Sequence, residues 1–323
     1  MTFTFNKKIK LFLLNNLIWV LLLGLYCGFG MFHHSLLTLD GFSFIVYSSV
    51  PIGFIVLAEA IALLSGNFDV SVGEITGFAA MASAYLITRY FYTAPIFLII
   101  FLPLLIGLCW GAFNGFFIGK LKLNPFLVTL GTFFLCYGGT LEISSCTIYN
   151  LPKNYLFLGN NLQTSIITFF IFVAIFAYVI FKTTIGTRFM SVGSNPTSSR
   201  MVGINIGNYY LFTFMIIGLL CGMAAIMYTG YLNSVPSTIA DNTVFMAFAG
   251  AILGGISLRG GRGSITNVVG GVLMISVLNA GLTMFNISPF IRQILFGLLI
   301  IVAIILNRSI ESSRDRILMK HPS

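Results

Sequence analysis

Residues 42–64 read FSFIVYSSVPIGFIVLAEAIALL, and the ten residues after them, 65–74, read SGNFDVSVGE. The first run is apolar almost throughout and carries a single ionisable carboxylate, Glu59. A helix needs roughly 20 mostly apolar residues to cross the hydrocarbon core of a bilayer. The two segments together therefore predict a membrane-spanning helix that ends in a polar break containing glycine.

The composition of the whole chain supports the same class of protein. Its 323 residues are 58% hydrophobic and 8% charged, whereas about a quarter of the residues in a soluble domain are charged. Only helices and closed barrels satisfy every backbone polar group in lipid, and the long unbroken apolar runs lack the alternation of barrel strands. We therefore predict an all-α membrane protein in which residues 1–323 form one transmembrane domain.

Polar, Gly and Pro positions divide the chain into ten candidate spans. They are residues 12–31, 42–64, 73–90, 95–119, 125–143, 164–181, 211–231, 243–258, 264–285 and 290–307.

The positions of the basic residues give these spans an orientation. With the N-terminus in the cytoplasm, 14 of the 17 Lys and Arg residues fall on cytoplasmic segments, and Arg89, Lys153 and Arg292 lie on or near the outer side. This asymmetry follows the positive-inside rule, and one span more or fewer would destroy it. We predict both termini in the cytoplasm, and we assign the net charge of +9 to short topology-setting loops rather than to a nucleic-acid surface.

The first span follows three lysines, Lys7, Lys8 and Lys10, in the manner of a signal peptide. No clear cleavage site with small residues follows it. We expect it to be retained.

The longest cytoplasmic connection runs over residues 182–210. Asn195 and Pro196 start a turn, and the hydroxyl residues 197–199 can cap a short helix that ends near Gly203. A polar element of this kind fits either the docking site of a protein partner or a solvated linker.

No residue pattern in the chain supplies an energy source or a catalytic centre. The glycine spacing of Gly115 to Lys120 is wrong for a Walker A loop. The five cysteines have no metal-ligand spacing, and no catalytic constellation of Ser, His and Asp or of paired carboxylates is evident. We predict a transport protein without ATPase activity of its own.

Polar groups near membrane depth are candidates for a solute path, because a charge facing lipid is costly. Glu59 lines the path or a subunit contact, or it makes a structural polar contact. In the break after it, Asp69 and Ser71 can cap the next helix, or the break places polar groups beside the path.

Glycines recur in two further patterns, one within a span and one in a turn. Gly107, Gly111 and Gly115 recur at a spacing of four, which suits close packing of helices. The turn Gly254 to Ser264 carries two arginines, which fits a tight cytoplasmic turn or an anion site.

Four segments resemble one family of transport proteins. GNFDVSVG (66–73) and NPFLVTLGT (124–132) are similar to two elements of the ribose-type sugar permeases of ABC importers, a group related to branched-chain amino acid permeases. GTR (186–188) with GSNP (193–196), Arg200 and GIN (203–205) resembles that family's loop that meets the ATPase. The segment from LGG (253–255) to GS (263–264) is the fourth match. All four occur in the family's order. The chain departs from the family at Asn67, Phe68 and Glu74.

The resemblance implies a type II importer fold with inverted repeats in spans 2–5 and 7–10. It implies a second permease subunit, identical or related, a pair of cytoplasmic ATPase domains that use the ATP, and a binding protein that delivers the solute from outside. It places ATPase docking at Gly186, Arg188, Gly193, Asn195, Pro196, Arg200, Gly203 and Asn205. Our candidates for the translocation path are Glu59, Asn67, Asp69, Ser71, Thr129 and Thr132.

We therefore predict a multi-pass inner-membrane permease subunit for a monosaccharide or a sugar-like solute, without a cofactor or metal of its own. A branched-chain amino acid or nucleoside permease is the nearest alternative. An ion-coupled secondary transporter is a further one, which the scarcity of intramembrane carboxylates argues against, and a membrane-embedded enzyme is the last.

Overall fold

The computed structural model describes residues 16–319, apart from the side chains of residues 311 and 313–319. All regular elements of the described residues are helices; there is one isolated β-bridge and no strand. Their elements are α2 (Leu17–Phe32), the 3₁₀ helix η1 (His34–Leu37), α3 (Leu39–Leu64), α4 (Val72–Tyr90), α5 (Ile96–Gly119), α6 (Pro125–Ile143), α7 (Lys153–Asn160), α8 (Leu162–Lys182), α9 (Thr184–Ser194), α10 (Pro196–Met201), α11 (Ile206–Leu232), α12 (Thr243–Leu253), α13 (Ile265–Met284) and α14 (Pro289–Met319).

Seven of the described helices are long and apolar enough to cross a membrane: α3, α5, α6, α8, α11, α13 and α14. The prediction of a helical membrane protein is therefore confirmed. The other three predicted spans are occupied by α2, α4 and α12, and α2 and α12 are apolar but have only 16 and 11 residues. The three N-terminal lysines and the start of the first predicted span lie outside the described residues.

Most helix boundaries lie within a few residues of the predicted spans, and three larger differences have a local cause. The span predicted to end at residue 258 ends at Leu253, because Gly254 packs against the backbone of Val268 and Gly255 takes a left-handed conformation with φ +78°. α11 begins before the predicted 211, at Ile206, because Asn205 caps it. α14 continues beyond the predicted 307, through charged residues that are good helix formers.

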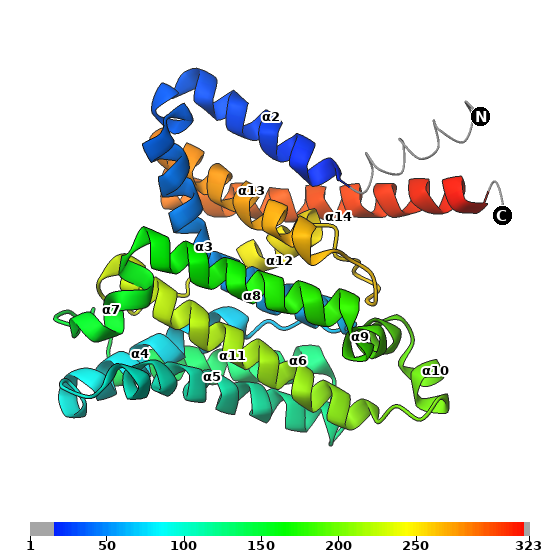
Figure 1. The fold of residues 1–323 in the computed structure, drawn as a ribbon, viewed down its shortest axis with the longest axis horizontal. Coiled ribbons are helices and arrows are strands. Elements are labelled where there is room, and N and C mark those ends of the chain that lie inside the picture. The colour runs from blue at the N-terminus through cyan, green and yellow to red at the C-terminus, as the bar shows by residue number, and fades with distance from the viewer. Residues whose placement is uncertain (1–15, 320–323) are drawn as a thin grey trace.

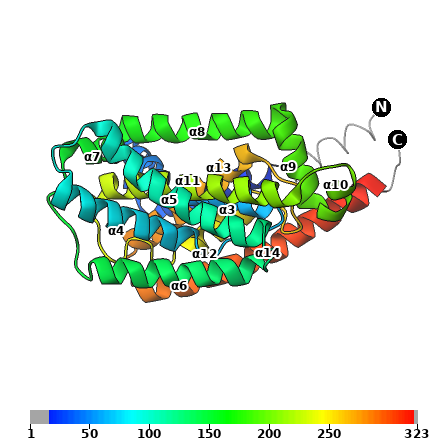
Figure 2. The ribbon, with the colours of Figure 1, turned by 90° about the horizontal axis from the view of Figure 1, so that it is seen from below.

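The helices lie roughly side by side in an elongated bundle (Figure 1). The start of α2, the end of α14 and the α9–α10 segment gather at one end of it, and α7 lies at the other (Figure 1). Figure 2 shows α8 along one side of the bundle and α6 along the opposite side. The two ends of the described chain therefore share a side with the predicted docking segment.

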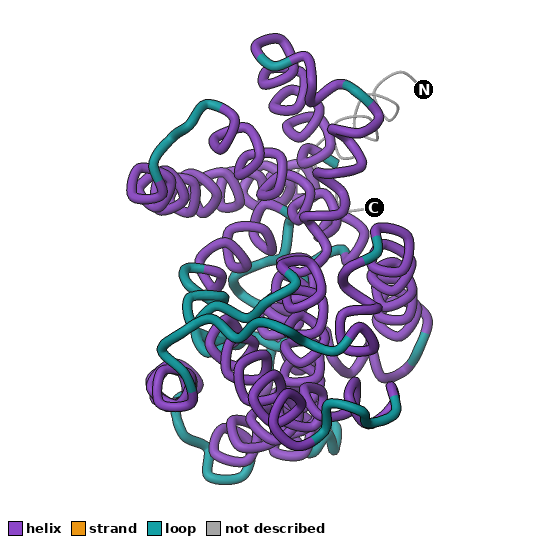
Figure 3. The backbone as a smooth tube through the Cα atoms, turned by 90° about the vertical axis from the view of Figure 1, so that its left-hand side faces the viewer, coloured by secondary structure: helices purple, strands orange, loops and turns teal. Residues whose placement is uncertain are grey.

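The connections at the α7 end are joined to each other. Figure 3 views the bundle from this end, where loops cross between the helices. Ile148, in the α6–α7 connection, pairs with Val235, in the α11–α12 connection, through two backbone hydrogen bonds of 3.0 Å. One bridge therefore couples the two connections.

Helices α3 and α11 form the centre of the bundle. Every side chain from Ser49 to Leu64 in α3 is buried, and α3 packs directly against α11. Each of these two helices packs against helices from the other half of the chain: α3 packs on α12 and α13, while α11 packs on α4 and α5. This exchange is the pattern expected if α3–α6 and α11–α14 are related repeats.

The seam between α5 and α11 is built from glycines. A methyl group on Gly107 would overlap the carbonyl oxygen of Gly218, and one on Gly111 would overlap that of Phe214. A methyl group on Gly115 would lie 2.8 Å from the Cα atom of Leu211. The prediction that these three glycines serve close helix packing is confirmed.

Candidate functional site

The break between α3 and α4 is an ordered, buried turn. Gly66 has φ +79°, which glycine adopts without steric cost, and the backbone N–H of Asn67 donates back to Ala62. The carboxylate oxygen Oδ1 of Asp69 accepts from the backbone N–H of Ser71 at 2.8 Å and from its hydroxyl at 2.5 Å. Asp69 therefore closes the turn before α4, whereas the capping role predicted for the Ser71 side chain is wrong, because that side chain makes no cap bond.

The Ser71 hydroxyl instead belongs to a network that links three helices. It accepts from Nδ2 of Asn114 in α5 at 3.0 Å, and Oδ1 of Asn114 accepts from the Thr132 hydroxyl in α6 at 2.5 Å. The backbone N–H of Val70 donates to the Thr129 hydroxyl at 3.3 Å. The side chains of Ser71, Asn114, Thr129 and Thr132 are buried.

Four of the six candidate path residues, Asp69, Ser71, Thr129 and Thr132, thus come together around Asn114. Sequence reasoning missed Asn114, although an amide inside the apolar run of α5 was a usable signal. Asn114 lies five residues before the end of α5, which is about 8 Å along the helix. The network is therefore close to the end of the bundle that carries α9 and α10.

The remaining two candidates lie elsewhere. Asn67 donates to the Ser65 hydroxyl at 2.9 Å and lines a separate pocket beside α10. Glu59 is fully buried and close enough to Asp69 for electrostatic interaction. Both carboxylate oxygens of Glu59 and Oδ2 of Asp69 have no hydrogen-bond partner among the described residues. Glu59 is buried among side chains of its own chain, and its place in the path or in a subunit contact stays a prediction.

Replacing Asn114 with alanine is expected to weaken the fold and the function together. It leaves the buried hydroxyl of Thr132 without its acceptor, at a cost of about 1–3 kcal/mol. We expect a lower thermal midpoint in detergent and reduced solute uptake. Thr88→Ala is the matched control, because that hydroxyl bonds only within its own helix. An unchanged midpoint for the Asn114 variant would contradict a structural role for the network.

The predicted docking connection contains two helices. α10 matches the predicted short helix, since Asn195 caps it by accepting from Ser198 N–H at 3.0 Å and Pro196 is its first residue. Gly203 ends it with φ +87°, and Asn205 caps α11. α9 was not predicted.

The other predicted docking residues divide by exposure. The backbone of Gly186 packs tightly against that of Ile180 in α8, and Gly193 is also buried. Arg188 and Arg200 are exposed, and neither forms an ion pair with another described residue. Among the predicted docking residues, these two arginines offer charge to a partner.

Three exposed apolar residues on the same segment were missed by sequence reasoning. Ile185 is 62% exposed, Met201 83% and Val202 76%. Two of them, Met201 and Val202, are neighbours at the end of α10, where a partner or the membrane surface would cover them. The α9–α10 segment therefore combines two cations with an apolar surface.

The end of α9 touches the α3–α4 break and the turn before α13. A methyl group on Gly193 would overlap the carbonyl oxygen of Leu64 and lie 2.8 Å from the backbone nitrogen of Gly261. That nitrogen donates to the same Leu64 oxygen at 2.9 Å. A methyl group on Gly66 would lie 3.0 Å from the carbonyl oxygen of Gly193. We call Gly66, Gly193, Gly260 and Gly261 the glycine junction.

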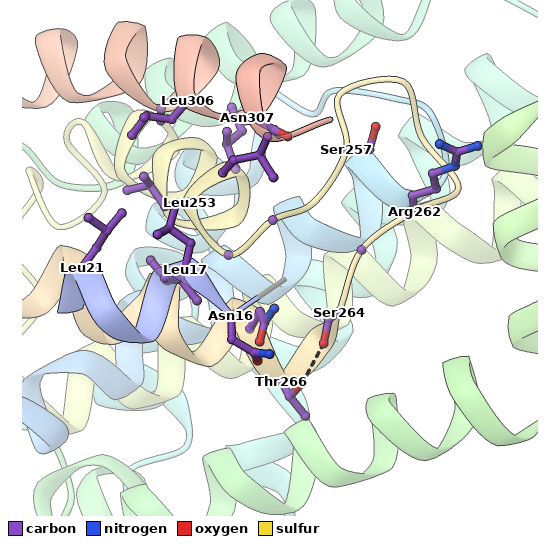
Figure 4. A pocket seen from close by; sticks show the side chains of 18 residues that line it. Asn16, Leu17, Leu21, Leu253, Ser257, Arg262, Ser264, Thr266, Leu306 and Asn307 are labelled. Atoms are coloured by element: carbon purple, nitrogen blue, oxygen red, sulfur yellow. Dashed lines mark hydrogen bonds between the residues drawn. The ribbon is translucent and has the colours of Figure 1, made fainter. Parts of the chain in front are cut away.

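The turn from Gly254 to Ser264 borders a pocket of about 400 Å³. Figure 4 shows Leu17 and Leu21 of α2, Leu253 and Leu306 around it, with Ser264 bonded to Thr266 at the start of α13. Arg262 extends away from the leucines, toward the outside (Figure 4). The turn thus connects the glycine junction to α13.

Comparison with known proteins places the chain in a family. Residues 41–304 match the family described as branched-chain amino acid transport system / permease component. The chain is 30% identical over 304 residues to the galactose/methyl galactoside import permease protein MglC of Escherichia coli (strain K12), covering 87% of this chain and 89% of that protein.

Two further relatives are more distant. The fructose import permease protein FrcC of Rhizobium meliloti is 27% identical over 80% of this chain and 75% of its own length. The autoinducer 2 import system permease protein LsrD of Enterobacter sp. (strain 638) is 25% identical over 89% of this chain and 90% of its own. No solved structure matches the chain. The family match covers both halves of the bundle and confirms the predicted relation to branched-chain amino acid permeases, so the chain belongs to the branched-chain amino acid transport system / permease component family.

Proposed function

We propose that this chain is the membrane-spanning permease subunit of an ATP-driven ABC importer for a monosaccharide or a sugar-like solute. The observation that carries the proposal is the 30% identity to a galactose import permease over 87% of this chain. Relatives named for import of fructose and of autoinducer 2 support the same solute class rather than ribose in particular. A branched-chain amino acid or nucleoside remains the alternative solute, since the matching family is described by branched-chain amino acids.

The proposed topology has ten spans in one domain of residues 1–323, with both termini in the cytoplasm of a bacterium and the protein in its inner membrane. The start of α2, the end of α14 and α9–α10 share one end of the bundle (Figure 1). An even number of spans requires that arrangement, and the basic residues assign this end to the cytoplasm.

The proposed assembly contains a second permease subunit, the same chain or a sister, with cytoplasmic ATPases and an outer binding protein. The chain itself binds no cofactor or metal, and the partner ATPase binds and hydrolyses the ATP. The exposed groups of α9–α10, among them Arg188, Arg200 and Met201, form the docking surface.

Closure of the ATPases would move α9, and the glycine junction passes this movement to the α3–α4 break. Gly193 touches the last residue of α3 and the turn before α13 by backbone contact alone. Interfaces packed this closely switch between discrete arrangements rather than deforming continuously. The buried network of Asp69, Ser71 and Asn114 begins a few residues beyond that contact. Docking and the candidate path are therefore neighbours.

Reconstitution into liposomes tests the proposal. With its ATPase and binding protein, the chain should drive uptake of a labelled monosaccharide on addition of ATP, and a panel containing galactose, fructose, ribose, leucine and adenosine identifies the solute. The chain alone should hydrolyse no ATP. Hydrolysis by the purified chain would overturn the division of labour, and uptake by the chain alone under a proton or sodium gradient would identify a secondary transporter.

Replacing Met201 with aspartate is expected to weaken binding of the ATPase without disturbing the bundle. The side chain is 83% exposed, so the fold loses little, whereas a carboxylate in an apolar contact must be desolvated. We expect the ATPase to co-purify at least about tenfold less. Phe290→Asp, on an equally exposed site outside α9–α10, is the control. Undiminished co-purification would contradict docking at α10.

A further inference from the structure

A second pocket, of about 890 Å³, lies between the end of α5, the start of α6 and the α10–α11 connection. Three basic residues from two distant parts of the sequence, Lys120, Lys122 and Arg200, line it. The other polar side chains around it are Asn67, Asn205 and Tyr210, and its lining contains no carboxylate.

The lining makes this pocket electropositive. All three cations are solvent-exposed, and none forms an ion pair in the part of the chain that the structure describes. The Lys120 ammonium donates to Oδ1 of Asn208, which fixes its position without neutralising its charge. Lys122 has φ +57°, an uncommon backbone conformation for a residue other than glycine. The positive-inside rule explains an excess of cations on the cytoplasmic side, but it does not explain why three of them line the same pocket.

Two helix starts add to the positive potential. Pro125 begins α6, with 19 residues, and Ile206 begins α11, with 27, and both line the pocket. The caps Asn124 and Asn205 each take up one backbone N–H, and the other N–H groups of the first turns remain as donors. Helix N-termini favour anions, so the cations and the dipoles act in the same direction.

Apolar side chains next to the pocket narrow the choice of anion. Leu121 is 51% exposed, Leu123 47%, Phe126 49% and Leu127 64%. Leu123 lines the pocket, and the other three flank it in the sequence between the end of α5 and the first turn of α6. A ligand that satisfies both surfaces has an anionic head and a hydrocarbon tail.

We propose that this pocket binds the phosphate-bearing headgroup of an anionic phospholipid, with its acyl chains along Leu123 and the start of α6. Basic pockets between spans at a membrane surface bind such headgroups. Free inorganic phosphate would leave the apolar residues in water, and a single carboxylate of a protein partner would leave most of the pocket empty. The site requires only that this end of the bundle lies at a membrane surface, so it stands independently of the proposed transport function.

Native mass spectrometry of the whole purified chain, supplied with phosphatidylglycerol or phosphatidylcholine, tests the site. The wild-type chain should retain phosphatidylglycerol in preference to phosphatidylcholine. Lys122→Gln should lower retention about fivefold, and Lys120→Gln with Lys122→Gln about 30-fold. The single variant removes no hydrogen bond to a described residue, so it keeps the test valid if the double variant folds poorly. Lys182→Gln removes the same charge from another exposed lysine and should change nothing.

Three results would overturn the assignment. Equal retention by the wild type and both variants would show that the pocket does not bind the lipid. Complete displacement of the lipid by millimolar inorganic phosphate would assign the pocket to free phosphate. Unchanged lipid retention with lost co-purification of the ATPase would assign the lysines to the protein partner.

Discussion

Replacing Gly193 with alanine should abolish most ATP-driven uptake while the membrane bundle stays folded. The added methyl group would overlap the carbonyl oxygen of Leu64 and crowd the nitrogen of Gly261, which donates to that oxygen. Backbone atoms cannot turn aside as a flexible side chain can, so α9 must move away from the end of α3. Overpacking of this kind costs about 1–3 kcal/mol, which lowers the population of the arrangement by a factor of about 5 to 150.

Uptake in proteoliposomes with the partner proteins measures the effect, and ATP hydrolysis by the same vesicles separates coupling from assembly. We expect hydrolysis to continue while uptake falls at least about fivefold. Gly24→Ala is the control, because that glycine in α2 has no neighbour within 4 Å. Wild-type uptake by the Gly193 variant would show that α9 does not act on the bundle through this contact.

Replacing Gly111 with leucine should remove the folded protein altogether. α5 and α11 approach so closely that a methyl group on Gly111 already overlaps the carbonyl oxygen of Phe214. A leucine would force the two helices apart along a seam that also contains Gly107 and Gly218. α11 also packs on α3 and α4, so separating it from α5 would disturb the centre of the bundle. The cost should exceed the roughly 1–3 kcal/mol of ordinary overpacking.

Size-exclusion chromatography after detergent extraction provides the measurement, with no monodisperse peak expected for the Gly111 variant. Gly131→Leu, in α6, places the same side chain at a helical glycine with nothing within 4 Å and should elute as the wild type does. A well-folded Gly111 variant would mean that the seam can open without loss of the bundle.

Apolar runs were sufficient to find a helix over every predicted span, because backbone hydrogen bonding in lipid leaves the chain almost no other choice. They were insufficient where a helix is polar or amphipathic. α9 was missed because Gly186 and Gly193 read as loop residues, although both are glycines for close backbone contact rather than for turning. α7 was missed because eight residues of mixed polarity have no clear period.

The candidate site, too, could be predicted from the sequence only in part. Asp69, Ser71, Thr129 and Thr132 were recognisable as polar groups in apolar surroundings. Asn114, which bonds to both Ser71 and Thr132, required knowledge of which faces of α5 and α6 meet. The glycine junction was beyond sequence reasoning for a stronger reason. Gly66 is 127 residues from Gly193, and Gly193 is 67 residues from Gly260, and no local propensity reports a contact over such distances. The same holds for the grouping of Lys120, Lys122 and Arg200.

The exchanged packing of the two halves has a consequence for biogenesis. α3 leaves the ribosome early, yet the helices that pack on it, α11, α12 and α13, are synthesised much later. Until those helices are made, the carboxylates that end up buried in α3 and in the α3–α4 break are not yet enclosed by other helices. Each half by itself lacks the packing that the other supplies to its central helix, so we expect a chain truncated after α8 to be degraded rather than accumulate as a stable half. Early helices must therefore be held by the insertion machinery or by other membrane chaperones until α11 arrives.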